Sequence, residues 1–276
     1  MATVLVSFIG TGNKIGNENE ETSKAGYEQV EHKFDNGSKV KTTIFGSALL
    51  KYLTDKDDTV DAWLIMGTPQ SIWCDLIQMF DEPVSETLQD LEIKQQYNFL
   101  AEEAGKDVGN KGTLRSLINQ EHLDKWNEIL SKKLKSTKVI CKEVGDATES
   151  DSQTKIFESI LQTINEGDKV VFDVTHGLRN QPIITSFVIM YLRYLKNIKE
   201  VEFYYGAKDL DGKVVRLDFC TELLRATEAV AIYAQTGNSV QIGKNLGMSD
   251  SFERKLEKLV FSDEVNRTDP QIPKDL

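Results

Sequence analysis

Short apolar runs alternate along the chain with longer segments of helical, amphipathic periodicity. A run rich in β-branched and aromatic residues that ends at glycine or another turn residue indicates a buried strand. Such runs predict strands over residues 3–9, 39–45, 60–66, 137–144, 169–174 and 200–205. The periodic segments predict helices over residues 48–53, 72–80, 85–135, 153–164 and 182–195. Strands that alternate with helices favour βαβ units, and therefore a parallel sheet with helices on both faces.

Three segments depart from this alternation. The helical segment 85–135 is too long for a single crossover, so we expect a helical insertion there. Asp211-Gly212 separates two strand-like runs within 204–219, which predicts a terminal antiparallel hairpin. Residues 13–38 are polar and contain glycines, which predicts an extended loop. The expected fold class is therefore α/β, with a Rossmann-like, mostly parallel sheet that ends in an antiparallel hairpin.

The length of 276 residues fits one large domain with an appendage. We expect residues 1–220 to form a Rossmann-like ligand-binding domain that contains the insertion. Residues 221–276 have a helical pattern and are expected to form a C-terminal linker or extension, with a tail from residue 266 that contains Pro270 and Pro273.

The composition is that of a globular protein, with 39% apolar and 28% charged residues. Lys and Arg total 33 against 44 Asp and Glu, so the net charge is −11. Proteins that bind duplex nucleic acid usually present a basic surface, so the charge argues against such a partner. Residues 81–107 alone carry a net charge of −6, which is typical of a solvated helical face.

The spacing of cysteine and histidine argues against a disulfide framework and a metal site. The three cysteines lie far apart without a CxxC pair, and the three histidines are equally scattered. We expect no metal and no cofactor, and a reducing, cytoplasmic environment. The N-terminal apolar run lacks the basic segment of a signal peptide, and the longest apolar stretch, 182–192, is too short to span a bilayer. We therefore expect no membrane association.

The segment FDVTHGLRNQP, residues 172–182, follows a predicted buried strand and leads into a helix with proline in its first turn. Ligands of open parallel sheets bind just past the carboxyl ends of the strands. The candidate ligand-binding residues here are Asp173, Thr175, His176, Gly177, Arg179 and Asn180. The glycine allows a ligand to approach the backbone closely. The alternative is that Asp173 and Thr175 only cap the next helix and that His176 is a structural turn residue.

Two other predicted strands also end in glycine-containing loops. The corresponding candidates are Gly10, Thr11, Gly12, Asn13 and Lys14 after the first strand, and Gly67, Thr68, Gln70 and Ser71 after the strand over 60–66. The third glycine of the dinucleotide fingerprint is missing, so we do not expect an NAD site. We expect the three strand ends to form one pocket of amides, hydroxyls and one or two cations, which suits a phosphodiester or a nucleotide.

The motif Asp173-x-Thr175-His176-Gly177, followed by Arg179, resembles the DxTHG signature of CRISPR-associated Rossmann-fold (CARF) proteins of type III CRISPR systems. The loops at 10–13 and 67–73 occur in the same order as in that family, and the resemblance covers roughly residues 1–235. It implies an antiviral-defence sensor that is a homodimer and binds cyclic oligoadenylate across its two-fold axis. Cyclic tetra-adenylate is the commoner ligand in the family.

The resemblance also leaves an enzymatic alternative open. Some family members cleave the ring without a metal, through attack of a 2′-hydroxyl on its adjacent phosphate. If this chain is such a ring nuclease, the candidates to orient that hydroxyl or stabilise the phosphorane are Thr11, Ser71, His176 and Arg179.

The C-terminal part departs from the family pattern. Typical relatives carry a HEPN ribonuclease with an Arg…His motif, but no histidine follows His176 in this sequence. Residues 241–259 have the pattern of a helix-turn-helix, which makes a ligand-gated DNA-binding regulator a further alternative. The cations of that segment are offset by acids, unlike those of a typical recognition helix.

Overall fold

The computed structural model describes residues 1–15, 24–56, 59–80, 83–104, 116–178, 180–198 and 200–236. The chain divides into two compact units, Met1–Arg216 and Leu217–Leu276. Within the second unit, helix α7 spans Asp218–Thr236. Arg179 and the helix-turn-helix expected over 241–259 lie outside the described residues.

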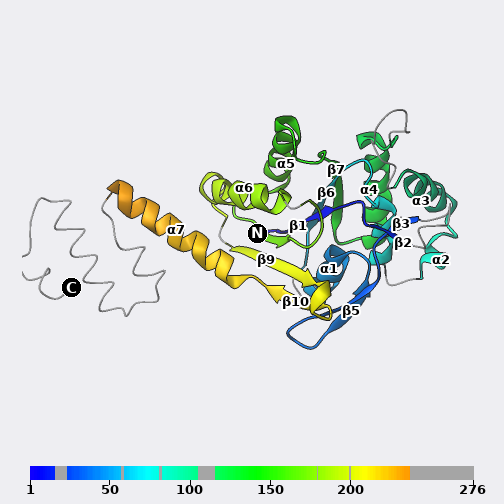
Figure 1. Cartoon of the computed structure of the whole chain (residues 1–276), viewed down its shortest axis with the longest axis horizontal. Helices are drawn as coiled ribbons and strands as arrows, with labels where there is room; N and C mark the ends of the chain where they lie inside the picture. The colour runs from blue at the N-terminus through cyan, green and yellow to red at the C-terminus, as the bar shows by residue number, and fades with distance from the viewer. Residues whose placement is uncertain are drawn as a thin grey trace, which may run out of the picture. The chain divides into compact units, whose positions relative to one another are not determined.

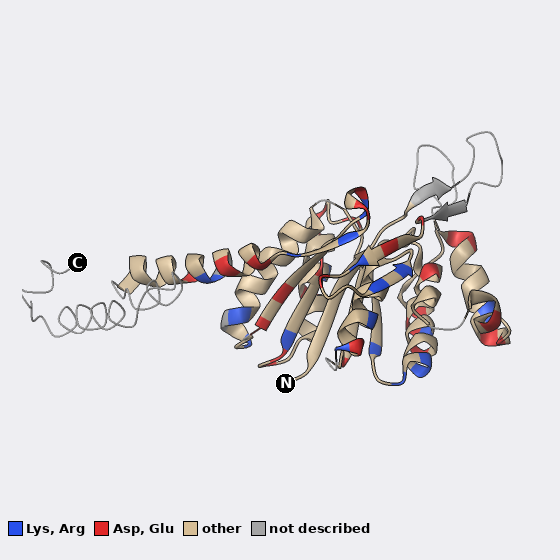
Figure 2. Ribbon diagram, turned by 90° about the horizontal axis from the view of Figure 1, so that it is seen from below, with Lys and Arg blue, Asp and Glu red and all other residues tan. Residues whose placement is uncertain are grey.

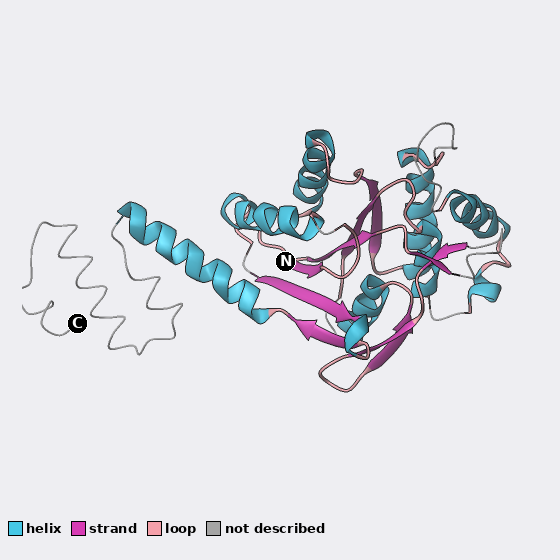
Figure 3. Cartoon of the chain, in the orientation of Figure 1, coloured by secondary structure: helices cyan, strands magenta, loops and turns pink. Residues whose placement is uncertain are grey.

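The first unit is built on an eight-stranded sheet with the order β5-β4-β10-β9-β8-β1-β6-β7 (Figures 1 and 3). Its parallel part comprises β1 (Thr3–Ile9), β6 (Ala62–Gly67), β7 (Lys138–Glu143), β8 (Lys169–Asp173) and β9 (Glu200–Ala207). The chain passes from β1 through β6 to β7, and then returns to the other side of β1 to form β8 and β9. The strand order therefore reverses between β1 and β8, which is the topological switch point where such sheets bind ligands. The predicted Rossmann-like α/β fold is confirmed.

The remaining strands extend the sheet beyond β9. The hairpin predicted at Asp211-Gly212 is confirmed, since β10 (Lys213–Arg216) pairs antiparallel with β9 after a short 3₁₀ helix, η2 (Lys208–Leu210). Asp211 and Gly212 both adopt positive φ, as such a connection requires.

The loop predicted over residues 13–38 is wrong in part. A small antiparallel ribbon of β2 (Asn13–Ile15) and β3 (Lys24–Gly26) lies there, and β4 (Val30–Lys33) joins the main sheet beside β10. The strand predicted over 39–45 is shorter in the structure, where β5 spans Lys39–Thr42. It pairs antiparallel with β4 and lies at the edge of the sheet. Short, lysine-rich strands are common at sheet edges, where a continuous apolar signal is lacking.

Helices cover both faces of the parallel strands (Figure 1). One apolar cluster joins strand residues such as Leu5 and Val171 to α1 (Phe45–Asp55), the 3₁₀ helix η1 (Trp73–Met79), α3 (Leu91–Glu103) and α4 (Gln120–Leu134). The other face carries α5 (Ser150–Thr163) and α6 (Gln181–Leu195). The short α2 (Val84–Thr87), α3 and α4 form the helical insertion that was predicted between two strands. No described helix is long and apolar enough to cross a membrane.

Candidate functional site at the switch point

The loops after β1 and β8 lie against each other at the switch point. A Cβ atom built on Gly10 would lie 3.8 Å from the amide nitrogen of Gly177. Gly177 has a φ of +101°, and a Cβ there would lie 2.7 Å from Cβ of Phe8. The glycine is therefore needed for tight packing of this loop on β1, in a backbone conformation that other residues rarely adopt.

Asp173 and Thr175 hold the loop after β8 in shape. The buried carboxylate of Asp173 accepts a hydrogen bond from the Thr175 amide at 2.8 Å, and burial raises the pKa of this carboxyl to about 6. The Thr175 hydroxyl accepts a hydrogen bond from the Gly206 amide at 2.8 Å, which joins the loop to β9. Asp173 thus has a structural role, whereas Thr175 also lines a cavity.

His176 caps helix α1. Its Nε2 accepts a hydrogen bond from the Phe45 amide at 3.0 Å, and the N-cap residue Ile44 provides no side-chain cap. Because Nε2 is an acceptor, the proton of the neutral ring lies on Nδ1. Burial, together with the nearby His32, lowers the pKa of His176 to about 4, and the positive end of the helix dipole acts in the same direction. The imidazole is therefore neutral at pH 7.

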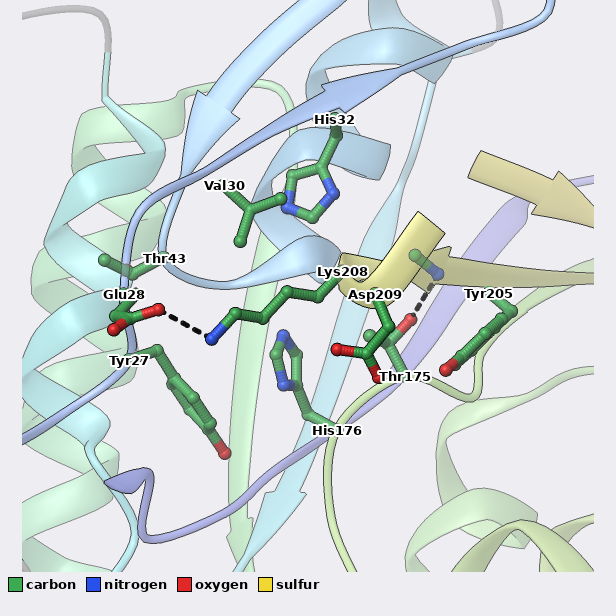
Figure 4. A pocket seen from close by; sticks show the side chains of 11 residues that line it. Tyr27, Glu28, Val30, His32, Thr43, Thr175, His176, Tyr205, Lys208 and Asp209 are labelled. Atoms are coloured by element: carbon green, nitrogen blue, oxygen red, sulfur yellow. Dashed lines mark hydrogen bonds and ion pairs between the residues drawn. The ribbon is translucent and has the colours of Figure 1, made fainter. Parts of the chain in front are cut away.

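A cavity of about 210 Å³ opens beside His176 (Figure 4). It is lined by Tyr27, Glu28, Val30, His32, Thr43, Thr175, His176, Tyr205, Gly206, Lys208 and Asp209. We call it the histidine cavity. The lining comes from segments that are far apart in the sequence, namely β4 and its flanks, the loop after β8, and the β9–η2 corner.

An ion pair crosses the histidine cavity. Lys208 extends between His32 and His176 and its Nζ lies 2.7 Å from Oε2 of Glu28 (Figure 4). Both side chains of the pair are exposed, whereas His32 is buried and its pKa is lowered by burial to about 4. Lys208 is thus the cation among the described residues that line the cavity.

Tyr27 connects the histidine cavity to the loop after β1. Its hydroxyl oxygen accepts a hydrogen bond from the Gly10 amide at 3.0 Å, and its ring centroid lies 4.5 Å from that of His176. Burial raises the pKa of this phenol to about 12, so it stays neutral. The sequence-based prediction missed Tyr27, His32, Thr43 and Lys208. The first three do not follow a parallel strand of the core, whereas Lys208 follows β9 in a segment that was predicted only as a hairpin.

A second cavity, of about 500 Å³, lies past the ends of β6 and β7 at the start of α5. It is lined by Thr68, Pro69, Gln70, Ser116, Gly145, Asp146, Thr148, Glu149 and Ser152, and we call it the hydroxyl cavity. Thr68 and Gln70 were predicted site residues. The loops after β8 and β6, which were expected to share one pocket, therefore line different cavities on either side of the switch point.

Ser71 and Asn180 brace the loops around these cavities. The fully buried Ser71 hydroxyl donates to the Ile9 carbonyl at 2.8 Å and accepts from the Thr68 amide at 2.9 Å. The Asn180 side-chain amide donates to the Ala147 carbonyl at 2.9 Å. Ser71 thereby joins the loop after β6, which follows Gly67 at the end of that strand, to the end of β1.

The remaining candidates belong to the loop after β1. The Gly10 carbonyl accepts a hydrogen bond from the Ile72 amide at 3.1 Å, so Gly10 lies between the loops after β6 and β8. Thr11 is exposed and Gly12 has a positive φ, while Asn13 and Lys14 pair with β3 through their backbones. Among the described residues, no group of three or more His, Cys, Asp or Glu is placed to hold a metal ion.

The described acidic residues of α3 do not line either cavity. Asp90, Glu92 and Glu102 are exposed at or on α3, and no residue of that helix lines either cavity. Figure 2 shows that acidic and basic residues are spread over many elements of the chain. The net charge of −11 therefore does not describe the site itself.

Comparison with known proteins identifies the family. Residues 4–214 match the model of the CARF domain of the CRISPR system endoribonuclease Csx1. The CRISPR-associated protein MJ1674 of Methanocaldococcus jannaschii is 27% identical over 275 residues, and the match covers 94% of this chain and 40% of that protein. The chain thus spans less than half the length of this relative. The chain has a Rossmann-like sheet with a candidate site at its switch point, and the family match covers most of its length. The chain therefore belongs to the Csx1-type CARF family of CRISPR-associated proteins.

Proposed function

We propose that this chain is a homodimeric sensor of cyclic oligoadenylate in type III CRISPR antiviral defence. The observation that carries the proposal is the histidine cavity at the switch point of a CARF domain. Its volume of about 210 Å³ is below the roughly 300–1,000 Å³ of pockets that enclose drug-sized ligands. It suits a single nucleobase, while the phosphodiester ring stays outside on the loop amides.

The two cavities favour a ring of four nucleotides. Each protomer offers the histidine cavity and the hydroxyl cavity on either side of the switch point. A homodimer with a two-fold axis doubles this set, so four bases can each occupy one cavity. Cyclic tetra-adenylate is therefore the preferred ligand.

An apolar stripe on α6 supports the homodimer. Ile183, Phe187, Tyr191 and Leu195 are 60, 68, 51 and 55% exposed, and their spacing of four places them on one side of the helix. Exposed apolar patches of this kind mark protein interaction sites. The helix begins directly after the ligand-binding loop, so a second copy packed on this stripe would bring two switch points to one two-fold axis.

A metal-independent ring nuclease is the second candidate. His176 lines the histidine cavity with its Nε2 engaged by α1, so its Nδ1–H is the group left to donate to a phosphate oxygen. Such a donor would stabilise the charge that develops when a 2′-hydroxyl attacks its phosphate. Thr11 and Arg179 remain candidates in this reaction, whereas the buried Ser71 acts by holding the loop after β6.

One experiment tests both functions. The protein is mixed with cyclic tri-, tetra- and hexa-adenylate, binding is measured by calorimetry, and products are identified by mass spectrometry. A sensor binds cyclic tetra-adenylate tightly and leaves it intact, whereas a ring nuclease yields linear products that end in a cyclic phosphate. If none of the rings binds, both proposals are wrong. If His176→Ala and Arg179→Ala leave cleavage unchanged, their assignment as catalytic residues is wrong.

A further inference from the structure

Two residues that line the histidine cavity each carry a buried polar atom without a hydrogen-bond partner. The atoms are Nδ1 of His32 and the hydroxyl oxygen of Thr43, neither of which is bonded to another described residue. His32 is 3% exposed and Thr43 is 6% exposed. Buried polar groups in native proteins are nearly always hydrogen-bonded, because an unpaired one loses its hydration without compensation. Both atoms therefore require a partner, and the cavity is where a bound molecule would supply it.

The two side chains are fixed by their surroundings. His32 lies on β4 with its ring centroid 5.0 Å from that of Phe45, the first residue of α1. Thr43 lies between the end of β5 and the start of the same helix. A pair of polar atoms held on a strand and beside a helix start can discriminate between ligands, because both belong to the folded framework of the domain.

The chemistry of the pair matches the amino edge of adenine. Burial keeps the His32 ring neutral at pH 7, so its Nδ1 can serve as an acceptor. The Thr43 hydroxyl can donate. Adenine offers an exocyclic amine, which is a donor, next to a ring nitrogen that is an acceptor. Guanine has an oxygen in place of that amine. This oxygen is an acceptor, so it could not form a hydrogen bond with the Nδ1 acceptor of His32.

The rest of the cavity supplies surface for the face of a base. Tyr27 and His176 lie with their ring centroids 4.5 Å apart, and the partly exposed Tyr205 also lines the cavity. Aromatic side chains stack on any base, so they add affinity without choosing among bases. Discrimination between bases therefore depends on the polar atoms of His32 and Thr43.

We propose that His32 and Thr43 are the specificity-determining residues of the histidine cavity: His32 Nδ1 accepts a hydrogen bond from the 6-amino group of adenine, and the Thr43 hydroxyl donates to the neighbouring ring nitrogen. This inference rests on the proposed function, because it assumes that a base of the cyclic ligand enters the cavity. It assigns the selection for adenine to a strand and a turn outside the parallel core.

The test compares two rings on each protein variant. Cyclic tetra-adenylate is paired with the same ring made of unsubstituted purine, which lacks only the 6-amino groups. The wild-type protein should bind the adenine ring roughly tenfold or more tightly than the purine ring, as expected for lost hydrogen bonds in a buried site. His32→Phe preserves the aromatic packing and should bind both rings with nearly equal affinity. Thr43→Val should weaken the binding of both rings, because both have the ring nitrogen to which the Thr43 hydroxyl donates.

Matched controls separate recognition from folding. His122→Phe replaces a histidine that also packs on an aromatic ring, 4.4 Å from Phe99, and should retain the full preference for adenine. Thr42→Val changes the neighbouring buried threonine, which does not line the cavity, and should leave both affinities unchanged. The ratio of the two affinities does not depend on the fraction of folded protein, so partial unfolding of a variant cannot imitate the result.

A second measurement uses the unmodified protein. The ¹⁵N resonance of His32 Nδ1 should shift on addition of the adenine ring and stay in place with the purine ring. If the wild-type protein binds both rings equally, or His32→Phe keeps the full preference, the assignment is wrong while the proposed function stands. If the wild-type protein binds neither ring, the proposed function fails and the assignment fails with it.

Discussion

His176 Nε2 and the Phe45 amide form a 3.0 Å hydrogen bond that joins the candidate ligand-binding loop to the first turn of α1. The bond satisfies a helix amide that no N-cap side chain reaches, and it fixes which nitrogen of the imidazole carries the proton. The same residue therefore caps α1 and lines the histidine cavity. This bond agrees with the structural interpretation of the histidine that the sequence left open, and its role in ligand binding stays a prediction.

Removal of this cap should destabilise the first unit. His176→Ala leaves the Phe45 amide without its acceptor, and loss of a cap costs about 0.5–2 kcal/mol of unfolding free energy. His176→Asn offers an oxygen to the same amide and should retain part of the stability. Chemical denaturation measures both variants. Equal midpoints for His176→Ala and the wild-type protein would show that the bond contributes nothing to stability.

The buried titratable groups predict opposite pH dependences for two variants. His32 has a folded pKa of about 4, so the unfolded chain binds its proton first as the pH falls below about 6.5. The wild-type protein thus loses stability relative to His32→Phe by about 2 kcal/mol between pH 7 and pH 4.5. For Asp173 the folded pKa is raised to about 6, so the folded state binds the proton first. Relative to Asp173→Asn, the wild-type protein therefore gains stability over the same pH range.

Denaturation curves recorded at several pH values check both signs. A stability difference between the wild-type protein and His32→Phe that does not change with pH would mean that His32 titrates normally in the folded protein.

Gly177→Ala should impair both stability and ring binding. The added methyl group would meet Phe8 and the Gln181 side chain, in a backbone conformation with φ of +101°. We expect a loss of about 1–3 kcal/mol in unfolding free energy and weak or no ring binding. Gly37→Ala is the matched control, since Gly37 has a φ of +85° but no atom within 4 Å of the added group. If the two variants lose equal stability, backbone strain alone explains the effect and the packing on Phe8 is unimportant.

Glu28→Gln should strengthen ring binding. The Glu28 carboxylate pairs with the exposed Lys208 ammonium, so a phosphate of the ring outside the cavity must compete with that carboxylate for the ammonium. We expect affinity for cyclic tetra-adenylate to rise about two- to fivefold and the stability to stay unchanged, because exposed ion pairs contribute little. Lys208→Met should weaken binding. Glu143→Gln breaks the comparable Lys155–Glu143 pair, which lies outside the histidine cavity, and should have no effect on affinity.

Phe187→Glu should convert the expected dimer into a monomer. A carboxylate in the middle of the α6 stripe would be buried without a partner in a dimer interface. Sedimentation at micromolar concentration measures the mass, and ring binding should be lost with the dimer. Leu91→Glu changes an equally exposed apolar residue on α3 and should leave the dimer intact. A monomeric wild-type protein, or a dimeric Phe187→Glu, would contradict the assignment of this face.

The parallel core could be predicted because its signals are local. The apolar runs that became β1, β6 and β8 are followed directly by their loops, and Pro182 marks the start of α6. The edge of the sheet could not be predicted in the same way. β4 pairs with β10 through Lys33 and Lys213, which are far apart in sequence and carry no apolar signal.

The candidate site was predicted only where it coincides with these loops. Thr175 and His176 line a cavity as expected, but Asp173 and Ser71 turn inward to hold the loops. A sequence does not distinguish these roles, because the residue types that cap turns also bind ligands. His32 was missed because long-range strand pairing brings it to the site, and Lys208 because the segment after β9 was predicted only as a hairpin.

The addition of β4 and β5 to the sheet has a consequence for how such a domain can diversify. Residues 27–43 supply one wall of the histidine cavity, yet they enter the chain between β1 and α1 without contributing a strand to the parallel core. Tyr27 holds the loop after β1 through the Gly10 amide, so we expect only residues 30–43 to form a cassette whose sequence can change while the switch point and its loops keep their geometry. Exchange of this cassette between relatives should transfer the preference for a base, and leave the capacity to hold a cyclic phosphodiester backbone in place.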